Sequence, residues 1–130
     1  MLGRLTDVPG SSAWVRGGVT AYANDVKIEQ LGVPAEAISA HGAVSEPVAV
    51  AMAAGVRDRL HADIGVSVTG IAGPTGGTPD KPVGTVVIAV ASGPEGASSG
   101  RTFKFIGDRQ MIRLQATQAA LDMVRRALGP

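Results

Sequence analysis

Lys27 and Tyr22 are the first residues placed for chemistry, because they flank the start of a helix predicted over 24–31. A cation in the first turn of a helix opposes the helix dipole, so we expect the pKa of Lys27 to be lowered. Such a lysine acts as a base or holds an anion; the other interpretation is a solvated surface lysine. Tyr22 either donates a hydrogen bond into a cleft or packs over the core at the end of a strand.

Three hydroxyl groups are further candidates for contact with a substrate. Ser11 and Ser12 follow Pro9-Gly10. A serine on a tight turn either presents its hydroxyl to a substrate or makes a local hydrogen bond. Thr69 ends an apolar run, where its hydroxyl either caps the following loop or contacts a ligand.

The segment 69–85 is a loop rich in glycine and proline between two apolar runs. Loops of this length in a small domain are usually functional or disordered, and the alternating prolines argue against disorder. Gly70, Gly73 and Gly76 either offer backbone N–H groups to a phosphate or an oxyanion, or simply make turns. The pattern is neither a Walker loop nor the dinucleotide-binding Gly-x-Gly-x-x-Gly.

Arg109 follows Gly107-Asp108 at the start of the last predicted helix. An arginine beside the free N–H groups of a helix N-terminus suits a phosphate; alternatively, Asp108 is only the cap and Arg109 its surface partner. Arg113 and the later arginines of this helix are interpreted as part of a solvated face. His41 either orients a ligand or makes a structural hydrogen bond.

The surrounding elements are predicted to bring these groups to one edge of a sheet. Helices alternate with strands, and the helical crossover makes strands 14–22 and 64–69 parallel. Strand 83–91 returns antiparallel, and strand 101–106 runs parallel to the first two. The predicted fold is α/β, a three-layer α/β/α sandwich with a mixed, mostly parallel sheet. Ligands bind at the edge where parallel strands end. Further helices are predicted over 1–6, 34–40, 45–60 and 108–128.

Composition excludes several function classes. The chain has 130 residues, which suits one domain over 1–130, and its net charge of +1 gives no strong attraction to nucleic acid or a membrane surface. Without cysteine there is no disulfide, thiolate chemistry or Cys-ligated zinc, and the histidines lack metal-ligand spacing. We expect no metal or cofactor, no membrane span and a cytoplasmic location.

Four blocks of the sequence resemble, in the same order, blocks of the CinA C-terminal domain family. The first is Gly-Gly-Val-Thr-Ala-Tyr-Ala-Asn at 17–24 with Lys27 following, and the second is 41–48. The third is the loop 69–85, and the fourth joins 107–109 with Gln-Ala-Thr at 115–117. Together they cover essentially the whole chain.

The resemblance implies an α/β/α domain that hydrolyses the carboxamide of nicotinamide mononucleotide to nicotinate mononucleotide and ammonia. The family chemistry is serine-hydrolase-like, with a lysine assisting the serine. By resemblance, Lys27 is the assisting lysine, and Tyr22, Ser12 and Thr69 line the reaction centre. The residues implied to contact the nucleotide are Ser11, Gly70, Gly73, Gly76 and, at its phosphate, Arg109.

Family members carry a further segment, with a strand and an Ala-Glu-Ser-type motif, ahead of the part that Met1 resembles. We therefore expect the chain to be N-terminally short, with an exposed sheet edge that favours a homo-oligomer. Catalysis then needs Ser11 or Ser12 as a substitute nucleophile. The alternative function is a non-catalytic nucleotide-binding or assembly module that has lost the nucleophile. A third interpretation, a phosphosugar-binding domain, rests on the glycine loop and Arg109 alone.

Overall fold

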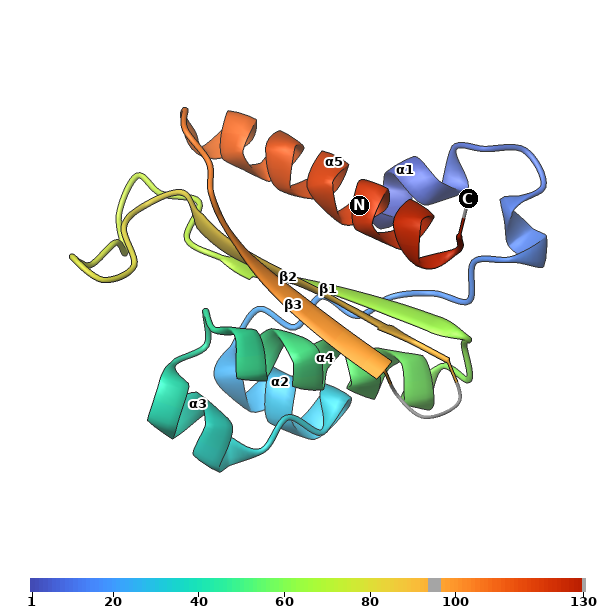
Figure 1. Cartoon of the computed structure of the whole chain (residues 1–130), viewed down its shortest axis with the longest axis horizontal. Coiled ribbons are helices and arrows are strands. Elements are labelled where there is room, and N and C mark those ends of the chain that lie inside the picture. The colour runs from blue at the N-terminus through green and yellow to red at the C-terminus, as the bar shows by residue number, and fades with distance from the viewer. Residues whose placement is uncertain (94–96, 130) are drawn as a thin grey trace.

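The computed structural model describes residues 1–93 and 97–129, with helices on both faces of a central sheet (Figure 1). Helices α5 and α1 cover one face, and α4 with α2 and α3 covers the other. The predicted α/β class is confirmed. The elements are α1 (Leu2–Thr6), the 3₁₀ turn η1 (Ser11–Ala13), α2 (Asn24–Leu31), α3 (Ala35–His41), α4 (Glu46–Arg59), β1 (Ile64–Gly70), β2 (Thr85–Ser92), β3 (Ala97–Lys104) and α5 (Arg109–Ala127).

The sheet has three strands in the order β1-β2-β3, and both pairs are antiparallel. Ile64 pairs with Ser92 and Gly70 with Val86, while Thr85 pairs with Lys104. The directions predicted for the last three strands are therefore confirmed, but a mostly parallel sheet is wrong. The turn predicted at 93–96 includes a turn at Gly93, and 94–96 lie outside the described residues.

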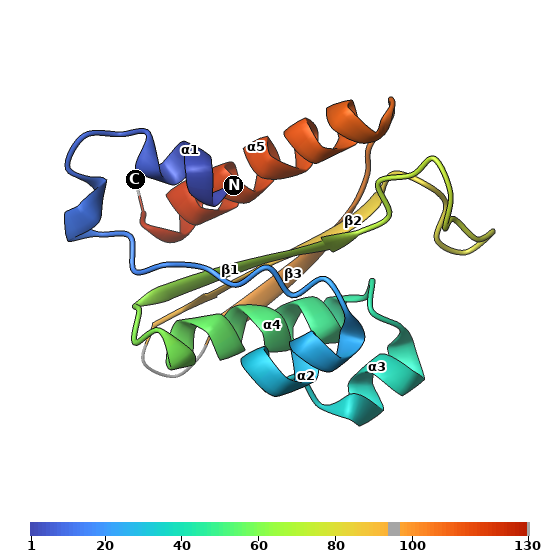
Figure 2. The same ribbon diagram turned by 180° about the vertical axis from the view of Figure 1, so that it is seen from behind.

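The predicted strand 14–22 is wrong, and its absence explains why the sheet is antiparallel. Residues 15–22 form an extended connection from η1 to α2 without strand pairing (Figure 2). The segment is held by side chains instead: Arg16 Nε donates to the Leu60 carbonyl at 3.0 Å, and Lys27 bonds the carbonyls of Ala21 and Tyr22. Residues 16–20 are exposed, so their apolar members bury nothing that would fix a register.

Strand β2 forms the centre of the core because both of its faces are covered. Val87, Ala89 and Ala91 pack with Ala49 and Ala53 of α4. Val86 and Ile88 pack on the other side with α5, whose buried residues are Ile112, Ala116 and Ala120. An uninterrupted apolar run is what a strand buried on both faces requires. Among the described residues, the buried hydrophobic core consists of Val, Ile, Leu, Ala and Met52.

The helix starts agree with the sequence in part. The Asp108 carboxylate accepts a hydrogen bond from the Met111 N–H at 2.9 Å, so Asp108 caps α5 as predicted. Ser45 occupies the N-cap position of α4, but its hydroxyl donates to the Gly42 carbonyl. Ala23 holds the N-cap position of α2, and Asn24 is the first helical residue.

Candidate functional site

One end of the molecule, which we call the rim, gathers most of the predicted site. The rim consists of the end of β1, the loop 71–84 and the N-terminal ends of α2 and α5, on the left in Figure 1. A pocket of about 330 Å³ opens there between α5 and the sheet. It is lined by Met1, Tyr22, Val68, Gly70, Ala72, Val86, Arg109, Ile112, Arg113, Ala116 and Thr117. Tyr22, Gly70 and Arg109 are thus brought together from distant parts of the chain.

Lys27 is buried, with 6% of its surface exposed, so it is not a solvated surface lysine. Its Nζ donates to the carbonyls of Ala21 at 3.0 Å and Tyr22 at 3.2 Å. Burial lowers the pKa of the Lys27 amine because it disfavours the charged form. The ammonium group has three N–H donors. Two of them have these backbone acceptors, and the third is bound by none of the described residues.

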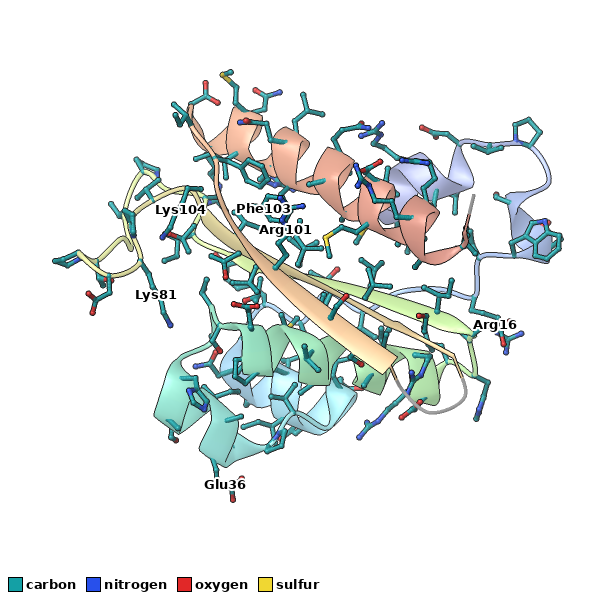
Figure 3. All side chains as sticks on the ribbon, viewed as in Figure 1. Arg16, Glu36, Lys81, Arg101, Phe103 and Lys104 are labelled. Atoms are coloured by element: carbon teal, nitrogen blue, oxygen red, sulfur yellow. The ribbon has the colours of Figure 1, made fainter. Side chains whose placement is uncertain are left out.

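Thr69 helps to fix the segment 41–45 beside the loop. Its hydroxyl donates to the Ala43 carbonyl at 2.9 Å, and Ser45 bonds the Gly42 carbonyl at 2.8 Å. Lys81 Nζ reaches the His41 carbonyl at 2.6 Å (Figure 3). Three successive carbonyls are therefore held from β1, α4 and the loop. His41 contributes its backbone to this arrangement, and Thr69 keeps its oxygen lone pairs as possible acceptors.

The glycine residues of the loop meet steric and conformational requirements. Gly73 and Gly76 have φ of 82° and 95°, a region that side chains disfavour. At Gly70, a Cβ would lie 2.8 Å from Val86 Cγ2 and 3.0 Å from the Thr85 carbonyl oxygen. Within residues 1–93 and 97–129, the N–H groups of Gly73 and Gly76 have no hydrogen-bond acceptor. Gly76 is exposed, so its N–H is available to a ligand, whereas Gly73 is buried.

Arg109 ties the loop to α5, since its Nη1 donates to the Gly73 carbonyl at 2.9 Å. Arg113 lines the same pocket, although its position in the sequence was interpreted as a solvated helix face. The signal that could have found it is the spacing of Arg109, Arg113 and Thr117. Residues four apart lie on one face of a helix. If Arg109 faces a site, Arg113 and Thr117 are therefore expected to face the same site.

Ser11 and Ser12 are not brought to the rim. They belong to η1, which lies at the opposite end of the molecule from loop 71–84 in both views (Figures 1 and 2). The backbone around them makes local bonds: Ser11 N donates to the Val8 carbonyl at 3.1 Å, and Trp14 N to the Ser11 carbonyl at 2.9 Å. A serine of this turn therefore does not reach Lys27, and the expected substitute nucleophile has no support in the geometry.

The described residues carry neither a metal-binding cluster nor a membrane-spanning helix. No group of three His, Asp or Glu side chains there is arranged to hold a metal ion. No helix in residues 1–93 or 97–129 has the length and hydropathy needed to cross a membrane.

The fold and the rim define an α/β protein with a small pocket at the end of its sheet, lined by apolar side chains and two arginines. The CinA C-terminal domain family matches residues 1–128, and the chain belongs to this family. A CinA-like protein of Gemmatimonas aurantiaca is 61% identical over 130 residues, and one of Mycolicibacterium paratuberculosis is 57% identical over 128. These matches cover 99% and 96% of this chain but 30% of each relative, so the chain spans less than a third of their length.

Solved structures share the fold over most of the chain. The competence/damage inducible protein CihA from Agrobacterium tumefaciens superposes with a TM-score of 0.92 at 40% identity, covering 96% of this chain and 76% of that one. A CinA superfamily protein from Escherichia coli gives 0.90 at 28% identity, covering 97% and 72%.

Proposed function

We propose that the rim binds nicotinamide mononucleotide and takes part in hydrolysis of its carboxamide to the acid and ammonia. One observation carries this proposal: a buried lysine with a lowered pKa lies at the same rim as a pocket lined by arginines. A neutral amine supplies a base, and arginines supply a site for the phosphate of a nucleotide. Membership of the CinA C-terminal domain family supports the same substrate class.

Amide hydrolysis needs a nucleophile, a base and donors for the oxyanion. In the proposed reaction, Lys27 takes the proton of an attacking hydroxyl group as its oxygen bonds to the carboxamide carbon. The N–H groups of Gly73 and Gly76, which have no acceptor among the described residues, are the proposed donors to the developing negative charge. The protonated Lys27 then returns its proton to the nitrogen as the C–N bond breaks, and ammonia leaves. Water, deprotonated by Lys27, attacks the ester that remains, and cleavage of its C–O bond releases the acid and restores the hydroxyl group. Tyr22 and Thr69 remain proposed members of the reaction centre.

A second function, nucleotide binding without catalysis, is favoured by one observation. Among the residues that line the pocket, the side-chain hydroxyl groups belong to Tyr22 and Thr117. The hydroxyl of Thr117 already donates to the Arg113 carbonyl at 2.9 Å, and Ser11 and Ser12 lie at the far end. With Lys27 and the two arginines but without an alcohol nucleophile, the rim would bind a nucleotide and not hydrolyse it.

Ammonia release and thermal stabilisation by nicotinamide mononucleotide separate these functions. Ammonia production that is lost in Lys27→Met and kept in Lys104→Met supports the hydrolase. Stabilisation of the protein without ammonia supports the binding module. No stabilisation and no ammonia at millimolar nucleotide rules out both.

A further inference from the structure

The outer edge of β3 is a row of backbone hydrogen-bonding groups without partners. β3 is an end strand of the sheet and lies at the front in Figure 1. The Phe105 N–H donates to the Gly84 carbonyl at 2.9 Å, so Phe105 directs its backbone groups toward β2. Directions alternate along an antiparallel strand, so Gly100, Thr102 and Lys104 direct theirs away from β2. Among the described residues, these outward groups have no hydrogen-bond partner.

β3 lacks the features that usually protect an edge strand from pairing with another chain. Such protection comes from proline or from charged side chains that cover the edge. No proline lies within 97–104. The Lys104 Nζ bonds the Thr85 hydroxyl at 2.9 Å, and the Arg101 guanidinium lies 4.9 Å from the centre of the Phe103 ring (Figure 3). Both cations are held by their own chain, so the edge stays open to a further strand.

The side chains of β3 match those of a second copy of β3 in one antiparallel register. Two identical strands that pair in this way are related by a two-fold axis, which we place at Thr102. Thr102 then lies opposite Thr102 of the second copy, which is a favourable cross-strand pair. Arg101 lies opposite Phe103 of the second copy, where its guanidinium gains a second aromatic ring. An axis at Arg101 would instead place two guanidinium groups opposite each other, which is unfavourable.

The same register brings opposite charges together. Glu46 of α4 lies over Gly100, because a Cβ on that glycine would be 3.4 Å from Glu46 Cβ. The Thr102 hydroxyl also donates to the Glu46 carboxylate, at 3.3 Å. With the axis at Thr102, Lys104 lies opposite Gly100 of the second copy. Its ammonium group is then next to the Glu46 carboxylate of that copy, and the symmetry repeats this pair.

We propose that two copies of this chain associate through β3, in antiparallel orientation, and join their three-stranded sheets into one continuous sheet. Main-chain hydrogen bonds provide the attraction, and the pairs across the axis fix the register. A strand edge gives a small interface, so we expect a dissociation constant on the order of 10 µM. The proposal concerns assembly of the chain and does not rest on the proposed function.

Sedimentation velocity of the full chain, from about 1 µM to about 1 mM, tests the association. The mass should rise with concentration from 13.1 kDa toward twice that value. Thr102→Lys places two ammonium groups opposite each other and should weaken the dimer about tenfold, whereas Thr102→Ser should keep it. The circular dichroism spectrum of each variant reports folding.

Single cysteines test the register, since the chain contains no cysteine of its own. In Thr102→Cys, the two Cα atoms are expected about 5.5 Å apart, so oxidation by diamide should give a disulfide-linked dimer. Ser99→Cys is the matched control because Ser99 is also exposed on β3. Its two copies would lie roughly 20 Å apart across the axis, too far for a disulfide.

Each outcome decides for or against the β3 dimer. A dimer that Thr102→Lys weakens, and that oxidation links in Thr102→Cys but not in Ser99→Cys, supports it. A chain that stays monomeric at about 1 mM overturns it, as does a dimer whose affinity Thr102→Lys leaves unchanged. Equal disulfide yields from the two cysteine variants also overturn it. If Thr102→Lys does not fold, the cysteine variants decide.

Discussion

The two ends of the molecule make different use of their polar side chains. At the rim, Lys27 and Thr69 each bond a backbone carbonyl outside regular structure, and Lys81 bonds the carbonyl of the last residue of α3. At the other end, Ser11 and Ser12 sit in a 3₁₀ turn whose bonds are local. In Figure 3, Lys81 extends from the loop toward α3, while Arg16, in the segment 15–22, lies at the far end.

This difference shows that a functional site can be recognised by the side-chain hydrogen bonds that fix its backbone as well as by its reactive groups. The loop 71–84 is tied to α5 by Arg109 and to the end of α3 by Lys81. Side chains that fix irregular backbone preorganise its N–H groups toward a ligand. A pair of serines on a turn lacks such support, and the geometry assigns it a structural role.

The largest effect is expected for Lys27→Met. Removing a general base typically lowers the rate about 10²- to 10⁴-fold, so turnover of nicotinamide mononucleotide should fall by at least the lower figure. Binding of the nucleotide, measured by calorimetry, should change much less because the arginines remain. If turnover in this variant equals that of the unchanged chain, Lys27 is not the base.

At high pH, the free energy of unfolding of the chain should depend on pH because the Lys27 amine is buried. Burial lowers the pKa of Lys27 in the folded state, while the unfolded chain keeps the ordinary value of about 10.4. The unfolded state therefore binds more protons between the two values, and stability rises with pH across that window. Each unit of difference is worth about 1.4 kcal/mol.

Urea unfolding of the unchanged chain and of Lys27→Met, from about pH 7 to about pH 11, measures this effect. The unchanged chain should gain stability relative to the variant as the pH rises through the lowered pKa toward about 10.4, and level off above it. A difference that stays flat with pH would mean that the amine is solvated in the folded protein.

A smaller effect is expected for Lys81→Met, which removes the bond to the His41 carbonyl. One hydrogen bond from a charged donor at a partly exposed site is worth about 1 kcal/mol. Hydrogen exchange should speed up about fivefold in the loop 71–84 and in 41–45, with the rest of the chain unchanged. Asp80→Asn, next in the chain and exposed, is the matched control. If the two variants show the same exchange rates over 71–84 and 41–45, Lys81 does not hold the loop.

The smallest effect is expected at the opposite end. Ser12→Ala should leave both nucleotide affinity and turnover unchanged within error, because η1 is far from the pocket. Loss of activity in this variant would contradict the structural role given to η1 and would support Ser12 as the nucleophile.

The sequence predicted the parts of the fold that local patterns determine. The apolar run before Ser92 predicts a strand, and Asp108 predicts the start of α5. The strand predicted over 14–22 was wrong. A strand exists only when a neighbouring strand supplies hydrogen bonds, and the segment itself does not encode that partner.

The sequence predicted the site residues that several motifs bring to one edge. It did not predict which side chains are buried or face the pocket. Tyr22, Gly70 and Arg109 share a pocket, as expected for residues that follow the ends of elements at one edge. The lowered pKa of Lys27 was expected from the helix dipole, whereas its cause is burial. Arg113 was missed because an exposed arginine on a helix has the same local sequence whether it faces solvent or a pocket.

The central claim, that one pocket at the rim is the ligand site, is tested most directly by an NMR titration of the labelled chain with nicotinamide mononucleotide. We predict that the amide shifts of Tyr22, Gly70, Ala72, Arg109 and Arg113 move together and saturate with one affinity, while those of Ser11 and Ser12 stay in place. Shifts centred on η1, or none at millimolar nucleotide, would contradict it.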